Sequence, residues 1–300
     1  MKETVLITGA NGFLAKKLTK YFEKKFIVKT LTTNKNNCDN INKFYWNIKN
    51  NHIDKELSIC DHLVHLAGYP IIKQWNKQNK KLMYSSRIDG AKLLFKYCIE
   101  NNIKPKTFIS ASAIGIYGMK TSGRKKEEDI TKSDWLSNMA WEWEKAADLF
   151  KKIGARVVKM RISLIISKDG LFLKSQLISM RYGLAMILGN KKRMISWIHV
   201  EDAVKFISEA IDNIKYEGSY NLATKNPITA EDLTRKIQKI LYPYSIRIYI
   251  PNRILNILLG ERSSIVTSNI IADNYKLEKE GFKYKYHKFE EIINNISFKK

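Results

Sequence analysis

Cysteine and histidine are scarce in this 300-residue chain, which has three cysteines and five histidines. The cysteines, Cys38, Cys60 and Cys98, are odd in number and widely scattered. Their spacing fits neither a disulfide framework nor a metal site, and the histidines lack the spacing of metal ligands. We therefore expect no bound metal and a reducing compartment, the cytoplasm.

Long apolar runs are also missing. No stretch approaches the roughly 18 consecutive apolar residues that a membrane helix needs. The first predicted strand begins at Thr4, so no signal peptide is expected before it. With 44% hydrophobic residues, the chain can still bury a sizeable core as one large domain or two lobes. We expect no membrane association.

Acidic residues are few beside the basic ones, and the formal net charge is +24. Such a charge raises nucleic-acid binding as a possibility, because basic patches bind phosphates. The lysines are however spread along the chain, and clusters such as residues 124–127 also contain acidic residues. We do not expect nucleic acid as the main partner; the charge would instead help attract a phosphate-bearing cofactor.

A glycine-containing turn follows the first strand. Residues 4–7 are aliphatic or β-branched, as in a buried parallel strand, and the helical spacing of Leu18, Tyr21 and Phe22 follows. Between them, the small residues Gly9 and Gly12 are followed by Ala15. A strand, a tight turn and a helix N-terminus form a cradle for an anion, and small residues let a pyrophosphate approach. The sequence therefore predicts a dinucleotide site.

The second strand, predicted at 26–31, ends without a carboxylate. In dinucleotide-binding folds an acidic residue there bonds the ribose 2′-hydroxyl. This chain has Thr32, Thr33, Asn34 and Lys35 instead, which could accommodate a 2′-phosphate. The pattern favours NADP over NAD, although Lys35 could be an ordinary solvated lysine.

Strand-like and helix-like segments alternate through the first 165 residues. Strands are predicted at 44–48, 61–68, 106–112 and 155–161, helices at 80–101 and 134–152 with Ser133 as N-cap, and an exposed loop at 119–132. This alternation predicts a doubly wound parallel α/β sheet with helices on both faces.

The pattern loosens after residue 165. We expect a helix within 170–188, a helix at 201–213, a strand at 219–222, a helix capped by Thr229 and ending at Leu241, and a strand at 245–250. The predicted organisation is a nucleotide-binding domain, 1–165, which also receives elements from about 195–225, and a smaller, interleaved α/β substrate lobe, 166–300.

Several segments together resemble the extended short-chain dehydrogenase/reductase superfamily, and more narrowly its NAD-dependent epimerase/dehydratase-like, atypical branch of YfcH-like epimerase proteins. The similarity runs from Thr4 to about Ile293. Its motifs are Thr8–Ala15, His65–Gly68, Ser85–Gly90, Ser110–Gly118, Trp143-Glu144, Ser196–Asp202, Gly260-Glu261 and Gly281-Phe282.

The resemblance implies a Rossmann lobe and a C-terminal lobe that closes over a small-molecule substrate. Many relatives form dimers, so a homodimer is consistent with it. Within this branch an arginine usually follows the Leu-Thr of strand two, where this chain has Thr33. The implied cofactor-binding residues are Thr8, Gly9, Asn11, Gly12, Phe13, Leu14, Thr32, Thr33, Leu66, Ala67, Gly68, Arg87, Ser110, Ala111 and Arg161, with Ser112 near the nicotinamide.

The superfamily's catalytic Tyr-x-x-x-Lys pair is missing. Alignment on Trp143-Glu144 puts Leu136 at the tyrosine position and Ala140 at the lysine position, and neither can transfer a proton. Trp141 and Lys145 have the right spacing, but an indole does not titrate in this range.

Ser112 and Tyr117 remain the candidate catalytic residues, with His199 as a further acid or base. The sequence thus predicts an NADP(H)-binding epimerase or reductase acting on a small carbonyl or sugar-derived substrate. The alternative is a catalytically silent dinucleotide-binding sensor or scaffold.

Overall fold

The first strand, β1 (Thr4–Thr8), lies inside an eight-stranded sheet and is buried at every position. It pairs in parallel with β2 (Ile27–Thr32) and β5 (His62–His65). The sheet order is β13-β8-β6-β5-β1-β2-β3-β4. Its remaining strands are β3 (Lys43–Asn47), β4 (His52–Ile53), β6 (Thr107–Ala113), β8 (Arg156–Ile162) and β13 (Gly218–Leu222).

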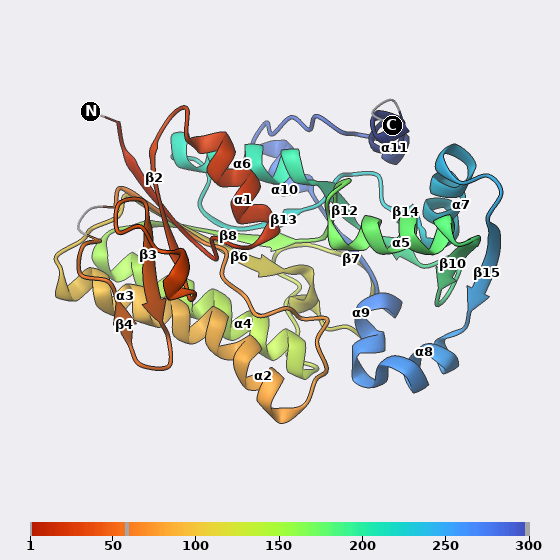
Figure 1. Ribbon diagram of the computed structural model, residues 1–300, viewed down its shortest axis with the longest axis horizontal. Helices are drawn as coiled ribbons and strands as arrows, with labels where there is room; N and C mark the ends of the chain where they lie inside the picture. The colour runs from red at the N-terminus through yellow and green to blue at the C-terminus, as the bar shows by residue number, and fades with distance from the viewer. Residues whose placement is uncertain (1, 58–59, 298–300) are drawn as a thin grey trace. The chain divides into compact units, whose positions relative to one another are not determined.

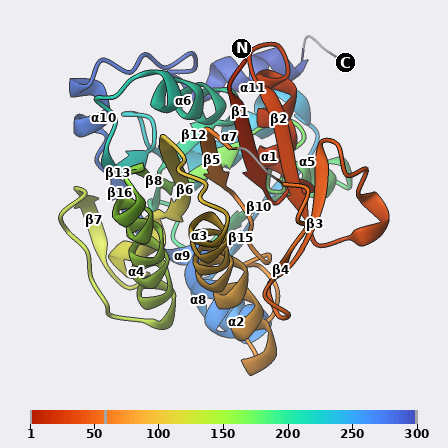
Figure 2. The same cartoon turned by 90° about the vertical axis from the view of Figure 1, so that its left-hand side faces the viewer.

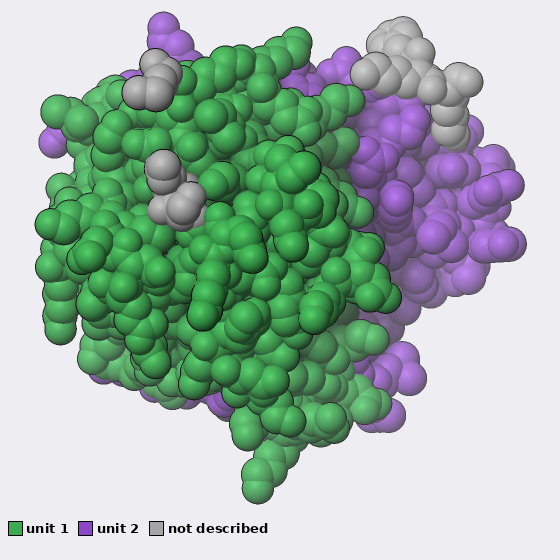
Figure 3. Space-filling view, turned by 60° about the vertical axis from the view of Figure 1, so that its left-hand side comes forward, with its two compact units in different colours: residues 1–113, 138–161, 204–220 green, residues 114–137, 162–203, 221–300 purple. Residues whose placement is uncertain are grey.

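The computed structural model describes residues 2–57 and 60–297. The chain forms two compact units (Figure 3). Unit 1 contains residues 1–113, 138–161 and 204–220, and unit 2 contains residues 114–137, 162–203 and 221–300. The units therefore interleave along the chain, and each is built from three separate segments.

Helices cover both faces of the unit 1 sheet. Figures 1 and 2 show α3 and α4 on one side and α6 on the other, with α1 on the α6 side in Figure 1. Between the sheet and α3, apolar side chains such as Leu63, Phe108 and Leu94 form one buried cluster. The helices are α1 (Phe13–Phe22), α2 (Lys77–Tyr84), α3 (Gly90–Glu100), α4 (Trp135–Asp148) and α6 (Val200–Asp212).

Unit 2 consists of small strand pairs and short helices around its own apolar cluster, which includes Leu173, Trp197 and Ile237. The strand pairs are β10 (Leu184–Leu188) with β15 (Ile246–Ile250), β11 (Met194–Ile195) with β14 (Ile228–Thr229), β9 (Leu164–Ile166) with β12 (Trp197–His199), and β7 (Ser122–Lys125) with β16 (Asn269–Ala272). The helices are α5 (Leu171–Arg181), α7 (Ala230–Leu241), α8 (Asn252–Leu259), α9 (Ser263–Thr267), α10 (Tyr275–Lys279) and α11 (Phe289–Ser297).

The predicted fold class is confirmed: a large parallel sheet is flanked by helices. Thr229 caps α7 as expected, since its hydroxyl accepts the Asp232 N–H at 3.0 Å. None of the helices in the described part of the chain has the length and apolar character that a bilayer crossing demands.

Three local predictions were wrong. The expected loop at 119–132 contains β7, which pairs with β16 far along the chain. The helix expected at 80–101 is interrupted by a π-helical turn at Ser85–Asp89. Finally, Asp134, not Ser133, caps α4, because its carboxylate accepts the Ser137 N–H at 2.8 Å.

Candidate functional site

The turn after β1 brings two backbone segments into close contact. Gly9 has φ +75°, which an L side chain rarely adopts, and a Cβ on Gly9 would lie 2.9 Å from the Cα of Ala67. The Gly12 N–H donates to the Gly9 carbonyl at 2.7 Å, and Gly12 is the N-cap of α1 without a side-chain cap. No side chain of the N-cap residue therefore competes with an anion for the first N–H groups of α1.

Thr8 and His65 join the ends of β1 and β5. The Thr8 hydroxyl oxygen accepts the N–H groups of Leu66 and Ala67, both at 3.1 Å. Its own O–H therefore donates to His65 Nδ1 at 2.8 Å. The His65 proton must then lie on Nε2, which donates to the Arg87 carbonyl at 2.9 Å. This arrangement needs a neutral imidazole, and burial lowers the pKa of His65 to about 4.

Mild acid is expected to destabilise the fold through His65. Its native pKa of about 4 lies below the ordinary 6.5, so the unfolded chain binds the proton more readily and stability falls with pH below 6.5. Between pH 8 and pH 5 the loss is about 2 kcal/mol. Urea unfolding of wild type and His65→Gln at both pH values measures it. A pH dependence that is identical in the two proteins would contradict this assignment.

Arg87 holds the loop that follows β5. A Cβ on Gly68 would lie 2.9 Å from Arg87 Nη2, and Arg87 Nη1 donates to the carbonyls of Tyr69 and Met83 at 3.0 Å each. The guanidinium also lies over the Trp143 ring, 5.1 Å from its centroid. Burial lowers the pKa of Arg87 to about 10, so it stays charged at neutral pH. Arg87 thus packs against Gly68 and holds the loop after β5 in place through the Tyr69 carbonyl.

A buried polar network includes Ser112, near the end of β6. The Ser112 hydroxyl donates to Glu144 Oε1 at 2.8 Å, and Arg161 donates to both carboxylate oxygens of Glu144 at 2.7 and 2.9 Å. Ser219 donates to Oε2 at 3.1 Å. Burial opposes the charge on Glu144, but Arg161 and the Ser112 hydroxyl outweigh it and hold the pKa of Glu144 below its ordinary value. The predicted site residues Ser112 and Arg161 therefore meet at one carboxylate.

The remaining predicted cofactor residues lie on several elements. Asn11 Nδ2 donates to Thr32 Oγ1 at 3.3 Å, while Thr33 is exposed. Ser110 is buried and donates to the Ala111 carbonyl at 2.9 Å. Phe13, Leu14 and Leu66 are half-buried.

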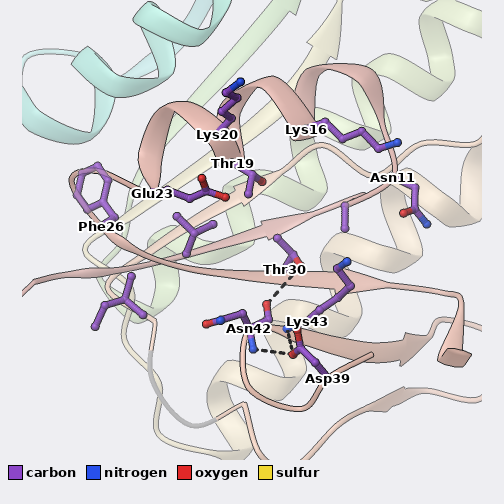
Figure 4. Close-up of a pocket in the computed structure, with 13 residues that line it drawn as sticks. Asn11, Lys16, Thr19, Lys20, Glu23, Phe26, Thr30, Asp39, Asn42 and Lys43 are labelled. Carbon is purple, nitrogen blue, oxygen red and sulfur yellow. Dashed lines mark hydrogen bonds between the residues drawn. The ribbon is translucent and has the colours of Figure 1, made fainter. Parts of the chain in front are cut away.

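A pocket of 630 Å³ lies beside the glycine turn (Figure 4). Its walls come from the turn, from the outer side of α1, from β2 and from the segment that enters β3. The residues are Ala10, Asn11, Lys16, Thr19, Lys20, Glu23, Phe26, Ile27, Val28, Thr30, Asp39, Asn42 and Lys43.

Comparison with known proteins identifies the family. The profile of the NAD dependent epimerase/dehydratase family matches residues 5–223. The chain belongs to this family. The curated relatives include the epimerase family protein YfhF of Bacillus subtilis, 28% identical over 297 residues that cover 97% of both chains. Another is the epimerase family protein SERP0438 of Staphylococcus epidermidis, 28% identical over 298 residues, covering 97% of this chain and 98% of the relative.

Solved structures of epimerase-family proteins share the fold. The human epimerase family protein SDR39U1 (isoform 2) with NADPH matches with a TM-score of 0.86 at 20% identity, covering 98% of this chain and 99% of that one. UDP-N-acetylglucosamine 4-epimerase from Bacillus cereus matches with a TM-score of 0.76 at 16% identity, covering 99% and 98%. The resemblance seen in the motifs is confirmed.

The two positions that the motif alignment assigns to the catalytic pair are packed positions on α4. Leu136 is 8% exposed and contacts Gly115, whose Cβ, if present, would lie 3.2 Å from Leu136 Cδ2. Ala140 is 2% exposed. The Lys145 ammonium lies 3.6 Å from the centroid of the Trp141 ring.

In this epimerase-family chain the other candidate proton donors lie in unit 2. Tyr117 is fully buried, and its hydroxyl donates to Asn221 Oδ1 at 2.6 Å. His199 Nδ1 accepts the Glu201 N–H at 3.3 Å, and its ring packs on Tyr286. Both side chains therefore have structural partners, and a role for Tyr117 in proton transfer stays a prediction.

Two elements of the site were not assigned a role from the sequence. Glu144 was recognised only as part of a motif, although it joins Ser112 to Arg161. The lysines of the pocket were also missed, because Lys16 and Lys43 lie far apart in the chain. The parallel register that places Lys43 beside Thr30 would have been needed to bring them together.

Proposed function

We propose that this chain binds NADP(H) in the glycine cradle and exchanges a hydride with a small carbonyl or sugar-derived substrate. The observation that carries the proposal is the approach of Gly9 to Ala67, which leaves no space for a side chain. That contact holds the turn close to the backbone that follows β5 and leaves the N-terminus of α1 accessible, which the binding of a pyrophosphate requires. The residues present therefore fit a dinucleotide.

The end of β2 supports NADP over NAD. Residues 32–35 contain no carboxylate for a ribose hydroxyl, and the Thr32 hydroxyl is already bonded by Asn11 and by the Asn34 N–H at 3.2 Å. A relative of the same fold was solved with NADPH. Bound NADP(H) would supply the hydride donor or acceptor.

The protein's own contribution to chemistry centres on Ser112. Because its O–H donates to the Glu144 carboxylate, its oxygen has lone pairs left to accept a hydrogen bond. A substrate hydroxyl is the kind of group that would donate to it. This differs from the usual superfamily role, in which the serine donates to the substrate oxygen.

A catalytically silent dinucleotide-binding sensor or scaffold is the second candidate. It is favoured by Leu136 and Ala140, which occupy the positions of the proton-transferring pair and are buried. Lys145 does not compensate, because its ammonium lies on the Trp141 ring.

Binding and turnover separate these two functions. We expect NADPH to bind in calorimetry and to be oxidised by some member of a panel of small carbonyls and sugar nucleotides. Because the usual general acid contributes about 10²- to 10⁴-fold, turnover should be lower than in relatives with the pair by about that factor. If NADPH bound but no member of the panel oxidised it, the enzyme function would be rejected and the catalytically silent dinucleotide-binding protein would remain. The absence of NADPH and NADH binding would reject both functions.

A further inference from the structure

The pocket beside the glycine turn begins where the turn meets β2. Ala10 and Asn11 belong to both the turn and the pocket wall. The Ala10 N–H donates to the Leu31 carbonyl at 3.3 Å, and Asn11 bonds Thr32. Thr30 and Thr32 lie two residues apart on β2, so their side chains point to the same face of the sheet. Through Asn11 the pocket adjoins the end of β2, where a ribose would lie in this fold.

Three of the residues in the walls of this pocket are lysines. Lys16 and Lys20 come from α1, and Lys43 begins β3. Within the described part of the chain, none of the three forms an ion pair.

The pocket also holds two acidic residues. Hydrogen bonds from backbone N–H groups lower the pKa of Asp39, and Asp39 lies close enough to Lys43 for the charge of the lysine to help lower this pKa. The Asp39 carboxylate accepts the backbone N–H groups of Ile41, Asn42 and Lys43 at 2.8–2.9 Å. Glu23 is at the far end of α1 and is exposed.

Two of the lysines lie near the turn. Figure 4 shows Lys16 and Asn11 at one end of the pocket with Lys43 nearby, whereas Glu23 and Phe26 lie at the opposite end. Lys43 is half-buried and lies beside Thr30 in the parallel register. Lys20 is one helical turn farther along α1 than Lys16, away from the glycine turn.

We propose that Lys16 and Lys43, together with the Asn11 amide, bind the 2′-phosphate of NADP(H). They would supply from α1 and β3 the charge that relatives place at the end of β2, where this chain has the uncharged Thr33. A phosphate monoester carries close to two negative charges at neutral pH, and ammonium groups bind it well. The assignment rests on the proposed function, because it presupposes that the cradle holds the pyrophosphate of the same molecule.

Calorimetry with NADPH and NADH tests the assignment on wild type, Lys16→Gln and Lys43→Gln. A charge-assisted hydrogen bond in a partly exposed pocket is worth about tenfold in affinity. Each variant should therefore bind NADPH about tenfold more weakly and NADH within about twofold of wild type. Lys20→Gln is the matched control, since it removes a charge from the same pocket without changing either affinity.

A gain of function completes the test. Adding Thr33→Arg to the Lys16→Gln/Lys43→Gln protein should restore most of the preference for NADPH, because it returns a cation to the end of β2. Unchanged ratios of NADPH to NADH affinity in both single variants would overturn the assignment and leave the proposed function standing. A wild type that prefers NADH would also overturn it. A wild type that binds neither cofactor would reject the proposed function along with it.

Discussion

Gly9→Ala is expected to weaken NADPH binding by about a hundredfold or more and to destabilise the protein by about 3 kcal/mol. An alanine at φ +75° costs about 1–2 kcal/mol, and its Cβ would meet the Ala67 backbone at 2.9 Å. Since backbone cannot rotate away as a side chain can, the turn must move. It would then no longer present the N–H groups of α1 to a pyrophosphate. Calorimetry and urea unfolding measure the two effects.

Gly154 provides a matched control. It has φ +83°, it is exposed after the short helix Leu149–Ile153, and a Cβ there would meet nothing within 4 Å. Gly154→Ala should therefore cost only the conformational strain, about 1 kcal/mol, and leave NADPH affinity unchanged. If Gly9→Ala behaved like Gly154→Ala in both measurements, the close approach of the turn to Ala67 would not be what makes the cradle.

Arg161→Met is expected to destabilise the protein by about 3–5 kcal/mol, because it leaves the Glu144 carboxylate buried without its cation. Glu144→Leu should cost a similar amount. The double variant Glu144→Leu/Arg161→Met should lose much less than the sum of the two, since no isolated charge remains buried. Chemical denaturation of the four proteins gives the coupling energy. Additive losses would show that the pair is not the unit that stabilises this site.

An exposed ion pair serves as the control for this double-mutant cycle. Lys96 and Glu100 lie one turn apart on α3, with side chains 61% and 57% exposed. Lys96→Met should change stability by less than about 0.5 kcal/mol.

The contribution of the Glu144–Arg161 pair to stability is expected to be lost in acid. The pKa of Glu144 is lowered in the native state, so the pair stabilises the fold fully above the ordinary pKa of 4.5, and this stabilisation declines as the pH falls through the native pKa. If Arg161 contacts the cofactor as the resemblance implies, Arg161→Met will also weaken NADPH binding.

Local sequence patterns predicted the strand, the turn and the helix of the cradle, because these three parts are contiguous. The buried run of β1, Gly9, Gly12 and the start of α1 follow one another within about 20 residues, and each has a strong local preference. The prediction that the usual catalytic pair is missing rests on local sequence in the same way, on Leu136 and Ala140 at fixed spacing before Glu144.

Features that depend on distant partners could not be predicted. β7 has few apolar residues, and it is a strand because it pairs with β16, about 150 residues later. The network around Glu144 needs residues 112, 161 and 219 from three segments of the chain. The pocket lysines share a wall only through the pairing of β2 with β3. In each case the deciding contact is between elements whose order in space the sequence pattern does not specify.

The interleaving of the two units has a consequence for how the protein is made. The chain passes from one unit to the other five times, and the sheet that begins with β1 receives its last strand, β13, only at residues 218–222. At about 5–20 residues per second, β1 waits about 10–40 s on the ribosome before that strand has been synthesised. Neither unit corresponds to a continuous stretch that could fold alone as it emerges. The cradle is therefore encoded first, but the sheet that supports it cannot be completed until residue 222 has been synthesised.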